Sequence, residues 1–182
     1  MNGDFTYYRF QCVPPSPPRV CSANFNYKFM NQKIIIKETF QIIGIEIRTS
    51  NEKTMIDIPK WWEKFYAENV KDKIPNKING DVLAVYTNYE GNHTKPYSYI
   101  LGCEVNSLDT IPEGMVGKII LSAQYEIFTA KGKMPDKIIE TWQRIWNPEI
   151  EKRRAYVTDF EVYGTKYGDP ENSEVEIYIG IK

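Results

Sequence analysis

Acidic and aromatic side chains alternate along the strand-like run at the end of the chain. In residues 174–181, Glu174, Glu176 and Tyr178 occupy one set of positions, and valine, isoleucine and glycine occupy the rest. Successive side chains of a strand point to opposite faces, so the apolar set should pack against helices and the polar set should face a groove. Glu176, deep in the run, is then half-buried and needs hydrogen-bond donors or a cation as its partner.

The elements that position this run occur twice. Each half contains a strand, a helix and two further strands, which predicts an α+β fold with tandem βαββ repeats related by a pseudo-twofold axis. The antiparallel sheets should carry their helices on one side and enclose a central ligand groove. The first half covers residues 33–108 and the second covers 115–182. Strands are expected at 42–48, 82–86, 97–105, 118–122, 125–128, 159–163 and 174–181, and helices at 58–65 and 138–146.

Two local signals refine the prediction for the first half of the domain. Asp57 followed by Ile58 and Pro59 predicts a helix start, because proline in the first turn loses no hydrogen bond. Gly44 interrupts a run of isoleucines, which predicts a bulge or a close approach between backbones.

The predicted groove has aromatic walls. The chain contains 13 Tyr, 8 Phe and 4 Trp, and a tyrosine hydroxyl needs a polar partner or water, so strand tyrosines favour a partly wet cavity. Aligning residues 97–102 with 174–179 places Tyr99 opposite Glu176 across the pseudo-twofold axis. An acid on one wall and an aromatic ring on the other attract a lipophilic cation through its charge and the ring quadrupole.

Composition argues against several classes of function. The net charge of -1 argues against direct DNA binding. Cys12, Cys21 and Cys103 form no paired motif, and His93 is the only histidine. His93 lies in a polar loop where exposure is expected, so no metal, cofactor or histidine-activated nucleophile is predicted. No apolar run reaches the roughly 20 residues of a membrane span and no secretory signal is visible, which favours a cytoplasmic location.

Residues 1–32 differ from the rest of the chain. The run Val13–Arg19 is mostly proline and cannot form a helix or an inner strand. Residues 1–32 are therefore predicted to be an extended or disordered arm, and 33–182 to be the folded domain. The arm is too short and proline-rich for a helix-turn-helix segment, so a free-standing module is expected.

The domain resembles the GyrI-like effector-binding domains, which occur as free-standing proteins and as ligand-sensing parts of multidrug-responsive and AraC-type transcription activators. The resemblance covers residues 34–182. It rests on Ile42-Ile43-Gly44, on the runs 58–65, 97–105, 125–128 and 160–163, on Trp142 and on Glu176-Ile177-Tyr178-Ile179. Gly180 departs from the family, which often has proline there.

The resemblance implies a pocket glutamate at Glu176, with Tyr99, Trp62, Trp142 and Tyr163 as wall residues. Tyr178, Tyr125 and Glu161 complete the set of candidate ligand-binding residues.

Three functions remain open on this resemblance. The first is a module that captures lipophilic, cationic aromatic compounds for sensing or sequestration. The second is a hydrolase of strained-ring (cyclopropanoid) genotoxins, with Glu46, Glu126, Glu161 or Glu176 as acid or base. The third is an interaction protein with a topoisomerase, a transcription regulator or a second copy as its partner. The near-neutral charge and the missing catalytic signature favour binding over catalysis.

Overall fold

The computed structural model describes residues 33–169 and 171–182. The predicted arm over residues 1–32, with Cys12 and Cys21, lies outside the described residues. Within them, no helix is long and apolar enough to cross a membrane. The elements are β1 (Lys33–Lys37), β2 (Phe40–Thr49), α1 (Thr54–Ala67), α2 (Val70–Lys73), β3 (Val82–Thr87), β4 (Tyr97–Val105), β5 (Val116–Ile120), β6 (Ala123–Gly132), α3 (Asp136–Ile145), α4 (Pro148–Glu151), β7 (Arg154–Tyr163), a 3-10 turn (Thr165–Gly168) and β8 (Ser173–Ile181).

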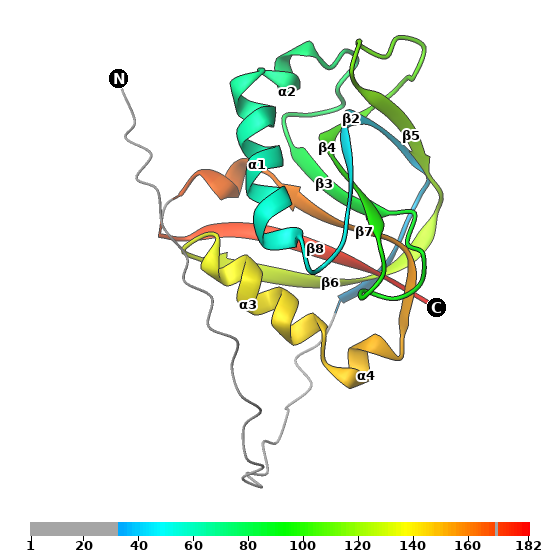
Figure 1. Cartoon of the computed structure of the whole chain (residues 1–182), viewed down its shortest axis with the longest axis vertical. Coiled ribbons are helices and arrows are strands. Elements are labelled where there is room, and N and C mark those ends of the chain that lie inside the picture. The colour runs from blue at the N-terminus through cyan, green and yellow to red at the C-terminus, as the bar shows by residue number, and fades with distance from the viewer. Residues whose placement is uncertain (1–32, 170) are drawn as a thin grey trace, which may run out of the picture. The chain divides into compact units, whose positions relative to one another are not determined.

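The strands of the described residues form one antiparallel sheet in the order β1-β6-β8-β7-β3-β4-β2-β5 (Figure 1). β3 and β7 are neighbours at its centre, and the order outward from them is equivalent on both sides, β3-β4-β2 and β7-β8-β6. Each half therefore supplies the same series of elements, β2-α1-β3-β4 and β6-α3-β7-β8. The predicted α+β fold with its pseudo-twofold βαββ arrangement is confirmed, and the two predicted half-sheets join into one continuous sheet.

Apolar side chains pack on both faces of this sheet. One face, which we call the helix-covered face, carries a large core that includes Phe65 of α1, Ile145 of α3 and Ile150 of α4. α1 lies over the half that contains β2 and β4, and α3 lies over β6 (Figure 1). The opposite face carries a smaller core around Tyr125 and Phe160.

The first helix begins earlier than predicted. The backbone N–H of Thr54 donates to the carbonyl of Ser50 at 3.0 Å, and α1 begins there. Asp57 lies inside the first turn, where its carboxylate accepts a hydrogen bond from the Thr49 hydroxyl at 2.7 Å and ties the helix to the end of β2. The prediction that Asp57 precedes the helix and that Pro59 lies in its first turn is therefore wrong by about one turn.

β2 and β4 approach closely at a pair of glycines. Gly44 is paired with Gly102 in an unbroken register, so no bulge occurs at Gly44. A Cβ at Gly44 would lie 2.7 Å from the Gly102 Cα and would overlap the Leu101 carbonyl oxygen. The close backbone approach, one of the two predictions for Gly44, is confirmed.

Candidate functional site

A buried carboxylate lies at the centre of the sheet, on β7. Glu161 is 2% exposed and is paired with Ala84 of β3 and Ile177 of β8. Directly paired residues of antiparallel strands project on the same face, and Ile177 belongs to the core under the helices. The strand neighbours Phe160 and Val162 belong to the core of the opposite face. Glu161 therefore points toward the helices from the middle of the sheet.

Three side chains donate hydrogen bonds to the Glu161 carboxylate. Trp142 Nε1 on α3 donates to Oε1 at 2.6 Å, and the Tyr86 hydroxyl on β3 donates to the same oxygen at 3.1 Å. The Tyr163 hydroxyl on β7 donates to Oε2 at 2.7 Å. All three donors are neutral, and no ion pair within the described ranges includes Glu161. We call these four residues the Glu161 cluster.

The three donors stabilise a negative charge on Glu161 through their dipoles, but no positive charge in the described part of the chain neutralises it. Burial raises the pKa of Glu161 above its usual 4.5, and the hydrogen bonds from Trp142, Tyr163 and Tyr86 oppose this rise. Desolvation disfavours the ionised form, whereas donors stabilise it. A positively charged group placed next to the carboxylate would remove most of the remaining cost of burying the charge.

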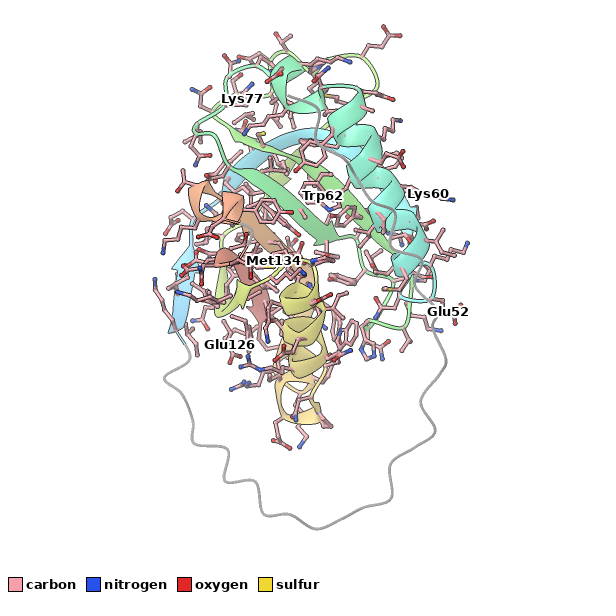
Figure 2. The ribbon with its side chains drawn as sticks, turned by 90° about the vertical axis from the view of Figure 1, so that its left-hand side faces the viewer. Glu52, Lys60, Trp62, Lys77, Glu126 and Met134 are labelled. Carbon is pink, nitrogen blue, oxygen red and sulfur yellow. The ribbon has the colours of Figure 1, made fainter. Side chains whose placement is uncertain are left out.

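Aromatic rings surround the cluster. The Tyr86 ring lies 5.2 Å from the Trp142 ring and 5.1 Å from the Tyr99 ring, measured between centroids. Trp62 of α1 contacts the Tyr163 ring at 4.7 Å. Figure 2 shows Trp62 on the side of α1 that faces the sheet. The faces of aromatic rings carry negative potential, so this shell adds to the attraction for a cation.

The Tyr99 hydroxyl is buried without a hydrogen-bond partner. Tyr99 is 0% exposed, and no residue that the structure describes meets the geometry of a hydrogen bond with its hydroxyl. Burial and the nearby charge of Glu161 raise the pKa of Tyr99 well above its usual value, and the adjacent Trp62 indole lowers it to a smaller extent. A buried polar group without a partner is costly, so this hydroxyl is available to a ligand.

We expect Tyr99→Phe to stabilise the ligand-free protein by about 1 kcal/mol, because phenylalanine keeps the ring and removes the unpaired hydroxyl. Urea unfolding measures the change. Tyr163→Phe is the matched control: it removes a hydroxyl that donates to Glu161, so it should destabilise the protein. A Tyr99→Phe variant less stable than the wild type would show that the hydroxyl is paired in solution.

A buried ion pair lies beside the Glu161 cluster. Arg154 and Asp159 are 1% and 0% exposed, and Arg154 Nη2 lies 2.6 Å from Asp159 Oδ2. The Tyr89 hydroxyl also donates to Asp159 Oδ2, at 2.6 Å. The Arg154 guanidinium lies 5.9 Å from the centroid of the Trp142 ring, whose N–H bonds Glu161. Arg154, whose guanidinium lies beside the Trp142 ring, is therefore already paired with Asp159 and does not serve as the cationic partner of Glu161.

The same network accounts for Gly180, where the resemblance leads one to expect proline. The Gly180 backbone N–H donates to Asp159 Oδ1 at 2.8 Å, and proline has no N–H to donate. A Cβ at this position would also lie 2.6 Å from the Thr158 carbonyl oxygen. The hydrogen bond thus excludes proline, and the limited space favours glycine.

His93 is less exposed than predicted. Its Nδ1 lies 3.2 Å from Glu151 Oε2, and its ring stacks on Trp146 with centroids 6.3 Å apart. The loop therefore holds His93 against α3 and α4, where it pairs with a carboxylate that also bonds Arg154. It is not part of the Glu161 cluster.

The structure divides the eight predicted site residues between the two faces of the sheet. Glu161, Trp142, Tyr163, Tyr99 and Trp62 lie on the helix-covered face. Glu176, Tyr178 and Tyr125 lie on the opposite face, where the Tyr125 ring contacts Phe160 at 5.1 Å. The helix-covered face thus brings together one acid and four aromatic residues of the predicted set.

The prediction that Glu176 is half-buried is wrong. Glu176 is exposed, and its carboxylate accepts a hydrogen bond from the Tyr178 hydroxyl at 2.8 Å. The isoleucines of β8 do pack against the helices as predicted, but the acid and the aromatic rings gather under the helices on that same face. The predicted pairing of Tyr99 with Glu176 fails for this reason, because the two side chains lie on opposite faces.

The other acids considered for catalysis do not join Glu161. Glu46 is exposed on β2. Glu126 is buried on β6, where it lies 2.9 Å from the guanidinium of Arg153. Glu161 is therefore the acid of the set that is buried beside the aromatic rings without a cationic partner in the described part of the chain.

Sequence reasoning missed Tyr86. All of β3 is buried, so its apolar run gives no alternation that would assign Tyr86 to a face. β7 carries a clearer signal, because Asp159, Glu161 and Tyr163 alternate with apolar residues along the mostly buried second half of the strand. Polar side chains at every second position of a buried strand indicate a shared set of hydrogen bonds on one face.

Comparison with known protein families identifies the family of this chain. The family model described as Cass2, integron-associated effector binding protein, matches residues 33–181. The chain belongs to this family. The match confirms the resemblance to effector-binding domains and covers both βαββ halves.

Relatives of this Cass2-family protein include solved structures and a curated regulator. An integron cassette protein of Vibrio cholerae, VCH_CASS2, is 32% identical, covers 83% of this chain and 95% of its own, and superposes with a TM-score of 0.63. The transcriptional regulator BrlR of Pseudomonas aeruginosa is 29% identical over 167 residues, which are 87% of this chain and 58% of BrlR. The structure of SAV2435 bound to tetraphenylphosphonium is 19% identical, covers 84% of this chain and 94% of its own, and has a TM-score of 0.71, which shows the shared fold.

Proposed function

We propose that this Cass2-family protein binds lipophilic organic cations at the Glu161 cluster, for sensing or sequestration. The observation that carries the proposal is a buried carboxylate that has three neutral donors and no cationic partner in the described part of the chain. Opposite charges attract far more strongly in a buried site than in water. A cation that enters this site supplies the partner that the protein itself does not.

The surroundings of Glu161 favour a cation with apolar, aromatic substituents. The Tyr86 ring contacts the rings of Tyr99 and Trp142, and the Trp62 ring of α1 contacts the ring of Tyr163, whose hydroxyl bonds Glu161. Each cation–π contact in such a site is worth about 0.5–2 kcal/mol. A lipophilic cation uses both the charge of Glu161 and the apolar area of these rings.

The relatives support the same class of ligand. SAV2435, which shares the fold, is bound to tetraphenylphosphonium, a permanent cation with four phenyl groups. BrlR is named as a transcriptional regulator, and effector binding by a domain of this kind would couple a chemical signal to such a role.

Hydrolysis of strained-ring compounds has weaker support. A general acid and a general base on one substrate require two carboxyl groups with different environments. The other buried acids of the helix-covered face, Asp159 and Glu126, each pair with an arginine. Of these three buried acids, Glu161 is the one without an arginine partner in the described part of the chain. A single unpaired acid suits the binding of a cation better than acid–base catalysis.

Titration of the full-length chain with two ions of matched shape tests the proposal. Tetraphenylphosphonium and tetraphenylborate have nearly the same size and apolar surface and carry opposite charges. We expect quenching of tryptophan fluorescence and a rise in melting temperature with the cation, since Trp62 and Trp142 border the site and a bound ligand stabilises the native state. Equal binding of tetraphenylborate, or no binding of either ion, would overturn it.

Binding of a permanent cation should weaken at acid pH. Burial raises the pKa of Glu161 above its usual 4.5, and the carboxylate becomes protonated as the pH falls through this raised pKa. Tetraphenylphosphonium does not titrate, so its affinity should be greatest above the pKa of Glu161 and should decrease as the pH falls through it. Dissociation constants measured between about pH 4 and pH 8 test this. An affinity independent of pH over this range would contradict the role of Glu161.

A further inference from the structure

The face of the sheet away from the helices carries a hollow of about 250 Å³, which we call the Asp81 hollow. Asp81, Glu104 and Glu176 contribute acidic groups to its wall, and Leu83 and Val162 form an apolar floor. We infer that the Asp81 hollow is a second binding site and that it takes linear alkyl diamines, dications whose two ammonium groups are joined by a short apolar chain. It shares no residue with the Glu161 cluster, so the inference goes beyond the proposed function.

The hollow forms because the sheet curls back on itself. Lys33 of β1 pairs with Ile127 of β6, and the same register continues past a bend, where Phe40 of β2 pairs with Ile120 of β5. The two ends of the sheet therefore share one ladder. The Phe40 ring lies 5.4 Å from the Phe160 ring of β7, although β4 and β3 separate β2 from β7 in the sheet. The face away from the helices is thus concave, and the mouth of a closed sheet is a common place for a ligand.

Strand pairing places two acids at the two ends of the apolar floor. Val162 of β7 is paired with Glu176 of β8 on one side and with Leu83 of β3 on the other. Two residues further along the chain, Gly164 has no side chain to fill the hollow, and a Cβ there would lie 3.2 Å from Asp81 Oδ1. The Asp81 carboxylate therefore lies over Gly164. With roughly 3.4 Å per residue and 4.8 Å between strands, about 8 Å separates this point from the backbone of Glu176.

The acids of the hollow carry more negative charge than Lys37 offsets. Lys37 Nζ lies 3.3 Å from Glu104 Oε2. In the part of the chain that the structure describes, neither Asp81 nor Glu176 forms an ion pair. Glu176 accepts a hydrogen bond from the neutral Tyr178 hydroxyl at 2.8 Å. Two carboxylates without cationic partners on one concave surface attract a dication more strongly than a monocation.

A diamine matches both the two charges and the floor between them. Each ammonium group carries three N–H donors, and a carboxylate without partners has about four lone-pair sites to accept them. The methylene chain of the diamine can cover Leu83 and Val162 and remove apolar surface from water. A metal ion is a poorer match, because no three acidic, histidine or cysteine side chains among the described residues are arranged to hold one.

Both ammonium groups have to bind together for the affinity to be measurable. A single contact with a partly solvated carboxylate is weak, and linking two such contacts raises the effective concentration of the second. We therefore expect 1,4-diaminobutane to bind about tenfold more tightly than 1-aminobutane. Isothermal titration of the full-length chain with each amine, at neutral pH and low ionic strength, measures the ratio of the two dissociation constants.

Three variants test which acids hold the diamine. Asp81→Asn and Glu176→Gln should each reduce the affinity for 1,4-diaminobutane to about that for 1-aminobutane, because each leaves one carboxylate at one end of the floor. Glu149→Gln is the matched control. It removes the same charge at a surface position where 77% of the side chain is exposed, outside the hollow, and it should leave the ratio unchanged. Melting curves check that each variant is folded.

The outcomes separate this inference from the proposed function. Equal affinities of the two amines, or no binding of either, would overturn the diamine site and leave the Glu161 cluster untouched. Diamine binding that is lost in Glu161→Gln and kept in Asp81→Asn and Glu176→Gln would overturn it as well, because the diamine then occupies the Glu161 cluster. An equal loss in Glu149→Gln would show general attraction to negative charge and overturn the assignment. Failure of tetraphenylphosphonium to bind, with the diamine results as expected, would overturn the proposed function alone.

Discussion

Glu161→Gln should weaken the binding of tetraphenylphosphonium by about 100-fold at neutral pH, because it removes the negative charge that attracts the cation. Glutamine is nearly isosteric with glutamate. Its carbonyl oxygen can accept from Trp142 and Tyr86 as Oε1 does, and its amide can donate to the Tyr163 oxygen in place of Oε2. Isothermal titration measures the affinity.

Two controls make this result specific to the charge of Glu161. Glu176→Gln removes the exposed glutamate of the opposite face and should leave the affinity unchanged. The stability of Glu161→Gln should exceed that of the ligand-free wild type at neutral pH. The direction of this stability difference follows from the raised pKa of Glu161, because the fold disfavours the ionised form. As the pH rises from the pKa that Glu161 has in the unfolded chain through the higher pKa that it has in the folded protein, the wild type loses stability. Unchanged cation affinity in Glu161→Gln would refute the assignment.

Arg154→Met should lower the free energy of unfolding by about 3–5 kcal/mol, because it leaves Asp159 as an uncompensated buried charge. Asp159 is 0% exposed, and within residues 33–169 and 171–182 it then keeps the Tyr89 hydroxyl and the Gly180 N–H as its hydrogen-bond partners. Methionine fills a similar volume, so the loss reports charge more than packing. Guanidinium unfolding at neutral pH measures the difference.

The double variant Arg154→Met/Asp159→Asn should recover much of that stability, because it removes both buried charges together. Lys152→Met tests the contrast with a solvated pair. Lys152 lies 2.8 Å from Glu149 on the surface, with 68% of its side chain exposed, so this variant should unfold like the wild type. A single Arg154→Met variant as stable as the wild type would show that the Asp159 carboxylate reaches water in the fold.

The sequence indicates the fold because both halves repeat the same apolar periods. Strands such as Tyr97–Val105 and helices such as Asp136–Ile145 follow directly from β-branched runs, helical spacing and the Pro135 and Asn147-Pro148 boundaries. The start of α1 is less predictable. Backbone hydrogen bonds from the turn after β2 begin that helix at Thr54, before the Asp57–Pro59 signal.

The position of the buried acid is harder to predict. It depends on which face of the sheet the helices cover and on which face carries the aromatic residues. Alternation in β8 correctly separates Ile177 from Glu176, but it does not say that the site lies on the isoleucine side. Glu161 and Tyr86 come from the two strands that meet at the centre of the sheet, and their pairing register is a long-range property. Local pattern carries no information about such a register when both faces are apolar.

The two halves of the sheet are alike in order but not in charge. Opposite Glu161, on the neighbouring central strand, stands Ala84, a methyl group where a second acid would put two like charges face to face. The second half of the chain therefore supplies a buried acid, and the first half supplies a small methyl side chain at the paired position. The proposed binding site therefore has one buried acid in a backbone with twofold pseudosymmetry, and we expect one bound cation for each chain.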